Sequence, residues 1–338
     1  MFVKILAFFT LIYCSMFNYN LAAKTLDEIK QRGHLQCGVS QSLLGFSYRE
    51  NGVWSGLDVD ICRAIAVAIF NNADQVKFTP LSTNDRFTSL QNKTIDILSR
   101  NTTWTYSRDT TLGIIFTNVT YYDGQGFMVP KKLGINTLAD LANKTICVRG
   151  GTTSAENISD YFGAKKIPYK LMTFEYSDRE VLAAYHTGDC QVYSGDRASL
   201  AAQREKLKDP NENLILTEVI SKEPLGPAVR QDDQHWINLV RWVIYGLIAA
   251  EEYGISKDNI KQFDNSTDPQ IRFFLGLTGD VGTPLGLDRT FMRNIISSVG
   301  NYGEIFERNV GANSKLKLPR GLNHLWSANG LMYSPPFN

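Results

Sequence analysis

The chain has 338 residues, of which 43% are hydrophobic, so it is long enough to bury a sizeable core and, on length alone, to form two domains. Its 35 Lys and Arg residues nearly balance its 34 Asp and Glu residues, and the formal net charge is +1. This balance argues against nucleic acid or an anionic membrane surface as the main partner.

Residues 1–23 have the pattern of a secretory signal peptide. Lys4 precedes a mostly apolar run from Ile5 to Phe17, which is shorter than the roughly 20 residues needed to span a bilayer. Small residues follow, and cleavage is expected after Ala23. The alternative is a membrane anchor. Export would place the mature chain outside the cytoplasm.

The cysteines that remain after residue 23 are predicted to form disulfides, because exported proteins fold in an oxidising compartment. They are Cys37, Cys62, Cys147 and Cys190, and they allow three pairings. We expect Cys37 to pair with Cys62 and Cys147 with Cys190, since each pair then lies within one lobe of the two proposed below. Buried free thiols are the alternative. Without a CxxC spacing or a Cys/His cluster, no metal is expected.

Strands and helices alternate in the first part of the chain. The predicted strands are residues 34–40, 76–81 and 95–99, with a helix from residue 56 and a short helix over 84–94. Asp58 is expected to cap the first of these helices. Such alternation predicts a mostly parallel sheet with helices on both faces, and ligands bind such sheets beyond the carboxyl ends of the strands.

The same alternation begins again after residue 130, which predicts a second α/β unit. The chain should cross between the units near residues 121–129 and 214–227, so that the second unit is an insertion into the first. The predicted boundaries are 24–127 and 223–338 for lobe 1 and 128–222 for lobe 2. The ligand would lie between the lobes.

The stretch "SRNTTWTYSRDT", residues 99–110, sets hydroxyls, an amide and two arginines directly after a predicted buried strand. The arginine fork of Arg108 suits a planar carboxylate, because it donates two parallel hydrogen bonds. Asn101 and Thr103 lie at the same strand end. We therefore expect this segment to hold the carboxylate of a small zwitterion, although a lone arginine is more often a solvated surface residue.

Two strand ends in the second unit carry further candidates. "GGTT", residues 150–153, is followed by Ser154 at a helix N-terminus, where an anionic group is favoured. "SGD" ends a later strand, and Asp196 could hold an ammonium group. Each has a simple alternative, because glycine turns and aspartates also cap helices. The chain has no Walker loop and no G-x-G-x-x-G motif, so no nucleotide cofactor is expected.

These motifs together resemble the periplasmic amino-acid-binding proteins of ABC transporters, in particular the general L-amino-acid and glutamate/glutamine/aspartate/asparagine group. The resemblance covers nearly all of the mature chain. It is carried by "GLDVDICRAIA", "DILSRNTTWTYSRDT", "YYDGQGFMV", "GGTT", "ISKEPLGPAVR" and "VGNYGEIFERN". It implies a two-lobe α/β fold of the type II periplasmic binding proteins, which closes around its ligand.

The resemblance also implies roles for individual residues. Thr103 and Arg108 match groups that bind the ligand carboxylate, and Asn101 matches a position whose backbone contacts the ligand. Thr153 matches a donor of the second lobe, and Asp196 matches the acid that receives the ammonium.

Side-chain discrimination is expected near Ser40 and Leu43, where relatives that prefer cationic ligands carry an acid and an aromatic residue. Arg100 could meet an acidic ligand side chain or face solvent. These residues fit acidic, amide or mixed L-amino acids.

The resemblance implies a monomer that needs no cofactor and delivers its ligand to an inner-membrane ABC permease from the periplasm. The residues from about Ser256 onward resemble an extension found in the general amino-acid group. The main rival is an exported enzyme on the same scaffold, such as a cyclohexadienyl-type dehydratase. That enzyme needs a general acid or base at the cleft, and no clear pair of catalytic carboxylates or nearby histidine is visible.

Overall fold

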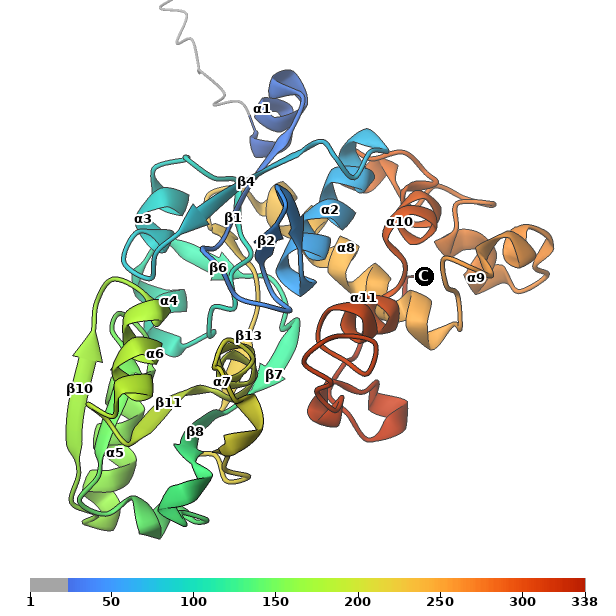
Figure 1. Cartoon of the computed structure of the whole chain (residues 1–338). Helices are drawn as coiled ribbons and strands as arrows, with labels where there is room; N and C mark the ends of the chain where they lie inside the picture. The colour runs from blue at the N-terminus through green and yellow to red at the C-terminus, as the bar shows by residue number, and fades with distance from the viewer. Residues whose placement is uncertain (1–23, 338) are drawn as a thin grey trace, which may run out of the picture.

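The computed structural model describes residues 24–337, and it contains two five-stranded mixed sheets. The predicted signal peptide, residues 1–23, lies outside the described residues. In Figure 1 the blue and cyan elements form lobe 1, the green elements form lobe 2, and the orange and red C-terminal part lies beside lobe 1. In residues 24–337, no helix combines the length and apolarity that crossing a bilayer requires.

The sheet of lobe 1 begins with parallel pairing of β1 with β4 and β5, as the alternating pattern predicts. The last two strands come from later in the chain, and β14 runs antiparallel to both of its neighbours. In sheet order the strands are β4 (Val76–Leu81), β1 (Leu35–Ser40), β5 (Ile97–Leu98), β14 (Ala228–Arg230) and β6 (Ile114–Phe116).

The sheet of lobe 2 repeats this plan. Strand β9 pairs in parallel with β10 and β11, and β8 is the one reversed strand of this sheet. In sheet order the strands are β10 (Lys170–Phe174), β9 (Thr145–Arg149), β11 (Val192–Asp196), β8 (Gln125–Pro130) and β12 (Asn213–Ile215).

Helices cover both faces of each sheet, because packing against the sheet removes their apolar sides from water. In lobe 1 they are α1 (Thr25–Arg32), α2 (Leu57–Phe70), α3 (Arg86–Gln91), α4 (Tyr106–Thr111) and α8 (Gln234–Glu252). In lobe 2 they are α5 (Ser154–Lys165), α6 (Asp178–Thr187) and α7 (Arg197–Arg204). A small hairpin joins β2 (Tyr48–Glu50) to β3 (Val53–Ser55).

A two-stranded antiparallel ribbon connects the lobes. It pairs β7 (Tyr121–Asp123) with β13 (Glu223–Leu225). The predicted boundary between residues 127 and 128 falls inside β8, all of which belongs to the second sheet. We therefore propose that the chain crosses between the lobes at Gly124 and at Lys222.

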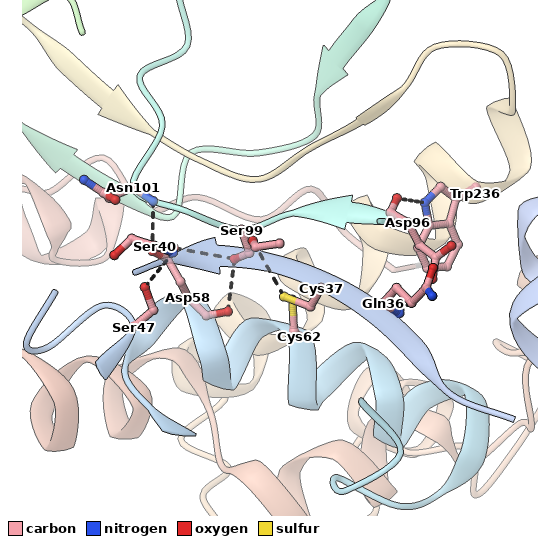
Figure 2. Close-up of a disulfide and its surroundings, with 11 residues drawn as sticks. Gln36, Cys37, Ser40, Ser47, Asp58, Cys62, Asp96, Ser99, Asn101 and Trp236 are labelled. Atoms are coloured by element: carbon pink, nitrogen blue, oxygen red, sulfur yellow. Dashed lines mark hydrogen bonds between the residues drawn. A yellow bond between two sulfur atoms is a disulfide. The ribbon is translucent and has the colours of Figure 1, made fainter. Parts of the chain in front are cut away.

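Each lobe contains one disulfide, with the pairing expected from the lobes. Cys37 of β1 is bonded to Cys62 of α2, and Cys147 of β9 is bonded to Cys190, which lies just before β11. Figure 2 shows the first of these bonds below the strand that leads to the functional site. Each bond therefore ties a central strand to an element packed against or beside it.

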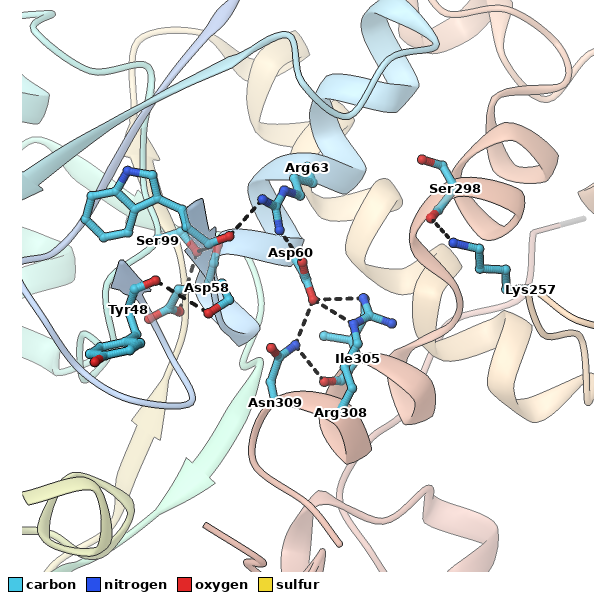
Figure 3. A network of polar contacts seen from close by, with 12 residues as sticks. Tyr48, Asp58, Asp60, Arg63, Ser99, Lys257, Ser298, Ile305, Arg308 and Asn309 are labelled. Atoms are coloured by element: carbon cyan, nitrogen blue, oxygen red, sulfur yellow. Dashed lines mark hydrogen bonds and ion pairs between the residues drawn. The ribbon is translucent and has the colours of Figure 1, made fainter. Parts of the chain in front are cut away.

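The C-terminal extension packs on lobe 1 and adds α9 (Pro269–Phe274), α10 (Phe291–Val299) and α11 (Tyr302–Asn309). Asp60 of α2 is buried and connects lobe 1 to the C-terminal extension. Its carboxylate accepts hydrogen bonds from Arg63 at 3.2 Å, from Arg308 at 2.9 Å and from Asn309 at 2.7 Å (Figure 3). Tyr302 donates to the carbonyl of Thr120 at 2.9 Å, directly before the connecting ribbon.

Candidate functional site

A pocket lies at the carboxyl ends of the parallel strands of both sheets. Every residue predicted from the sequence to bind the ligand lines this one pocket, although the residues come from distant parts of the chain. They are Ser40, Leu43, Arg100, Asn101, Thr103, Arg108, Thr153, Ser154 and Asp196. The first six of these residues come from lobe 1, and the last three come from lobe 2.

The strand end of lobe 1 is shaped by Asp58. Its carboxylate accepts a hydrogen bond from the backbone N–H of Asn101 at 2.8 Å, and the Ser99 hydroxyl donates to its carbonyl at 3.0 Å (Figure 2). Asn101 has a φ of 31°, a conformation that asparagine tolerates better than most residues. The expectation that Asp58 caps α2 is wrong, because the helix begins at Leu57 with Gly56 as its N-cap. Burial raises the pKa of Asp58 to about 7.

Arg108 enters the pocket from α4. Its guanidinium donates to the carbonyl of Thr103 at 2.9 Å and lies over the ring of Phe87, 5.5 Å from the centroid. Burial lowers the pKa of Arg108, and the nearby carboxylates of Glu223 and Asp196 act in the opposite direction. The side chain is held as a half-buried cation with donor groups remaining for a ligand.

The glycine turn of lobe 2 approaches lobe 1 closely. Thr83 donates to the carbonyl of Gly150 at 3.1 Å, and Arg86 donates to the carbonyl of Gly151 at 3.0 Å. Gly151 has a φ of +66°, and a Cβ built there would come within 2.5 Å of the amide oxygen of Asn84. Glycine is needed at position 151, because a side chain there would prevent this contact between the lobes. Since the two lobes are in contact here, the structure has a closed arrangement.

Asp196 ends β11 and directs a carboxylate at the pocket. It occupies the N-cap position of α7, but its side chain makes no capping hydrogen bond. Within residues 24–337 it also forms no ion pair within 4.0 Å. Burial raises the pKa of Asp196 well above its usual value, and the carboxylates of Asp123 and Glu223 raise it further. A ligand cation would relieve this cost.

Glu223 is a buried pocket-side acid to which the sequence did not point. Its carboxylate accepts hydrogen bonds from Thr103 of lobe 1 at 2.6 Å and from Thr153 of lobe 2 at 3.2 Å. Asn157 of lobe 2 and Ser221, which belongs to the crossing segment around Lys222, also donate to it, at 2.8 and 2.6 Å. The available signal was a carboxylate inside the apolar, proline-containing stretch "KEPLGP". Glu223 therefore links both lobes through residues that line the pocket.

Arg86, Arg149 and Thr83 also line the pocket and were not predicted to bind the ligand. Both arginines are almost completely buried. Burial lowers the pKa of Arg86 well below its usual value and lowers that of Arg100 to about 10, and neighbouring guanidiniums lower both pKa values further. Asp178 acts in the opposite direction on Arg100. The pocket is therefore rich in positive charge.

Comparison with known proteins gives one consistent family. Residues 35–259 match the bacterial extracellular solute-binding proteins of family 3. The chain is 50% identical to the general L-amino acid-binding periplasmic protein of Rhizobium johnstonii, over 93% of both chains. It is 46% identical to the glutamate/glutamine/aspartate/asparagine-binding protein of Rhodobacter capsulatus, over 94% of both.

Among solved structures, the chain resembles an ABC transporter periplasmic binding protein from Brucella ovis with glutathione bound. The two share 49% of their residues, and the TM-score is 0.92 over 94% of this chain and all of that one. The family match ends at residue 259, so most of the C-terminal extension lies outside it.

Proposed function

The chain belongs to the bacterial extracellular solute-binding proteins of family 3, and we propose that it captures free L-amino acids for an ABC transporter. The observation that supports this most directly is the pair of opposite charges in one pocket. Arg108 comes from lobe 1 and Asp196 from lobe 2. An α-amino acid has a carboxylate for the first and an ammonium for the second.

Binding would shift the protein toward the closed form. Only the closed form brings both charges onto one small ligand, so the free energy of binding favours closure. Hydrogen bonds to charged groups contribute about 1.5–3 kcal/mol each, and they strengthen when closure excludes water. Asn101 and Ser154 would supply further polar contacts. The Thr103 and Thr153 hydroxyls donate to Glu223, so their oxygens would accept from the ligand ammonium.

The relatives indicate the class of ligand. One is named for general L-amino acids and another for glutamate, glutamine, aspartate and asparagine. The pocket of this chain fits acidic, amide or mixed L-amino acids, because Ser40 and Leu43, which line it, offer no negative charge to a cationic side chain. Arg100 lines the same pocket and would face the ligand side chain.

The names of the relatives also support a partner and a location for this chain. The closed protein would dock on an inner-membrane permease and release its ligand there. It would act as a monomer in the periplasm, after export and removal of residues 1–23. The disulfide in each lobe supports export, because such bonds persist in oxidising compartments.

A catalytic role on this scaffold has less support. The relatives that cover more than nine tenths of the chain are named as binding proteins. The charge of Glu223 raises the pKa of Asp196, but the Glu223 carboxylate already accepts hydrogen bonds from hydroxyl and amide donors of both lobes. The chain is therefore a binding protein and not an enzyme.

A thermal-shift screen against the twenty L-amino acids, followed by calorimetry on the hits, tests the proposal. We expect a raised melting temperature with several acidic or amide amino acids, because a ligand that binds only the folded state stabilises it. Mass spectrometry of the recovered ligand should show no turnover. A screen with no stabilising amino acid, or a chemically changed ligand, would reject the proposal.

A further inference from the structure

Three arginines surround one part of the pocket. Arg86 begins α3 in lobe 1, Arg100 follows β5 in lobe 1, and Arg149 ends β9 in lobe 2. Their exposed fractions are 3%, 7% and 7%, and all three line the pocket together with Thr83. Burial of three guanidiniums in one place is costly unless anionic groups meet them.

The protein itself does not satisfy these side chains. Each has one hydrogen bond to a neutral oxygen: Arg86 to the carbonyl of Gly151, Arg100 to that of Leu81, and Arg149 to the hydroxyl of Thr83. The Nε atom of Arg86 and the Nε and Nη1 atoms of Arg149 are buried without a partner among the described residues. These donors are available to an acceptor that enters from the pocket.

The charges of the pocket lead to the same conclusion. None of the three arginines forms an ion pair within 4.0 Å in residues 24–337. Among residues 24–337, the carboxylates that line the pocket are Asp196 and Asp178, and the charge of Asp178 favours the charged form of Arg100. The buried carboxylate of Asp58 also lies near Arg100, and it accepts a hydrogen bond from the backbone N–H of Asn101.

A zwitterion adds no net charge to this pocket. It would pair with Arg108 and Asp196 and leave Arg86, Arg100 and Arg149 against Asp178 and Asp58, an excess of positive charge. A ligand with one more negative charge would reduce this excess.

We propose that Arg86, Arg100 and Arg149 form a subsite for a second carboxylate of the ligand. The protein therefore prefers L-amino acids with an acidic side chain over their amides. This inference rests on the proposed function, because the α-carboxylate and ammonium must be held by Arg108 and Asp196. The planar guanidinium matches a carboxylate in shape and offers two parallel donors to it.

Calorimetry with L-glutamate and L-glutamine tests the subsite, because the two ligands have nearly the same shape and differ by one charge. We expect the wild-type protein to bind glutamate at least about tenfold more tightly than glutamine, as the strength of charge-assisted hydrogen bonds implies. Equal binding, or tighter binding of glutamine, would overturn the subsite and leave the proposed function intact. Failure of every amino acid to bind would instead overturn the proposed function.

Two variants locate the effect. In Arg149→Met we expect glutamate binding to weaken at least about tenfold, with glutamine binding changed less than about twofold. Arg149→Lys should recover part of the preference, because it restores the charge without the fork. The control is Arg179→Met, which removes an exposed arginine of the same lobe that does not line the pocket. An equal loss for both ligands in Arg149→Met would show a general structural role and reject the subsite.

Discussion

The sheets of the two lobes have the same pattern of strand directions but differ in how they are supported. In each sheet the reversed strand stands fourth, β14 in lobe 1 and β8 in lobe 2. The core of lobe 1 continues through α2 and α8 into the C-terminal helices. Lobe 2 has a smaller apolar cluster on each face of its sheet. We infer that lobe 1 is the larger rigid body and that lobe 2 moves when a ligand binds.

The chemistry of the pocket is divided between the same two bodies. Lobe 1 contributes Arg108, a cation, and lobe 2 contributes Asp196, an anion with a raised pKa. Under the proposed function, Arg108 holds one end of the amino acid and Asp196 the other, so affinity would depend on closure. Each variant below tests one of the two lobes or the connection between them.

Arg108→Ala should have the largest effect on affinity. It removes the cation of lobe 1 and leaves the ligand carboxylate buried without its partner, which costs about 3–5 kcal/mol. Calorimetry should show amino-acid binding weakened at least about a hundredfold. Arg108→Lys should fall between wild type and alanine, since it keeps the charge and loses the fork. Near-native affinity in Arg108→Ala, with an unchanged melting temperature, would remove this residue from the site.

Acidic pH should weaken binding through lobe 2. Burial, Asp123 and Glu223 raise the pKa of Asp196 in the empty pocket, while Arg108 and Arg86 oppose the shift. A ligand ammonium needs the ionised carboxylate, so binding lowers that pKa and releases a proton. Affinity should therefore fall as pH decreases below the raised pKa, by up to about tenfold per pH unit.

Calorimetry in a series of buffers from mildly alkaline to mildly acidic measures this dependence. The matched variant is Asp196→Asn, which cannot titrate. It should bind more weakly at neutral pH, and its affinity should change less across the series than that of the wild type, in which Asp196 titrates in addition to Asp58. An identical pH profile for wild type and variant would assign the titration to another group.

Glu223→Gln tests the connection between the lobes. The carboxylate joins Thr103 of lobe 1 to Thr153 and Asn157 of lobe 2. The amide has nearly the same shape but places donors against these donors, so the closed form should lose charge-assisted hydrogen bonds of about 1.5–3 kcal/mol each. We expect affinity to fall about tenfold.

The control for this variant is Ser221→Ala, which removes a donor from the crossing segment but none that spans the lobes. It should bind nearly as wild type does. Scattering from the ligand-bound Glu223→Gln protein should also show a larger open fraction. If both variants bind equally well, Glu223 serves only the local structure of β13.

The sequence predicted most of the fold and the centre of the site because those features are local. Strands and helices follow from apolar periodicity, and Asn101, Thr103 and Asp196 lie where such strands end. Asp58 was placed as a helix cap because aspartate favours that position. The helix instead starts beside Gly56, whose φ of 130° and close approach to Phe46 allow no side chain there.

The remaining site residues depend on how distant segments meet. Arg86 and Arg149 approach each other only because the glycine turn of lobe 2 closes on lobe 1. Glu223 gains its partners from two lobes and a crossing segment. Local periodicity in the sequence does not predict contacts between distant segments. In the sequence alone these residues therefore look like ordinary charged residues.

The smallest expected effect concerns the extension and the ribbon that joins the lobes. Asn323 is buried, and its amide oxygen accepts from the backbone N–H of Tyr122 at 2.7 Å while its amide nitrogen donates to the Tyr122 carbonyl at 3.1 Å. The extension thus pairs with strand β7 as another strand would. Asn323→Ala leaves two backbone groups unpaired, which costs about 1–3 kcal/mol when they stay dry.

If the extension supports lobe 1 and the ribbon together, Asn323→Ala should lower the melting temperature by a few degrees and change affinity less than Glu223→Gln does. Faster ligand release in stopped-flow experiments is expected as well, because β7 would bend more easily when lobe 2 moves. The control is Asn313→Ala, an exposed asparagine of the same extension. Equal melting temperatures and release rates for both variants would show that water replaces the Asn323 contacts, and that lobe 1 is rigid through its apolar core alone.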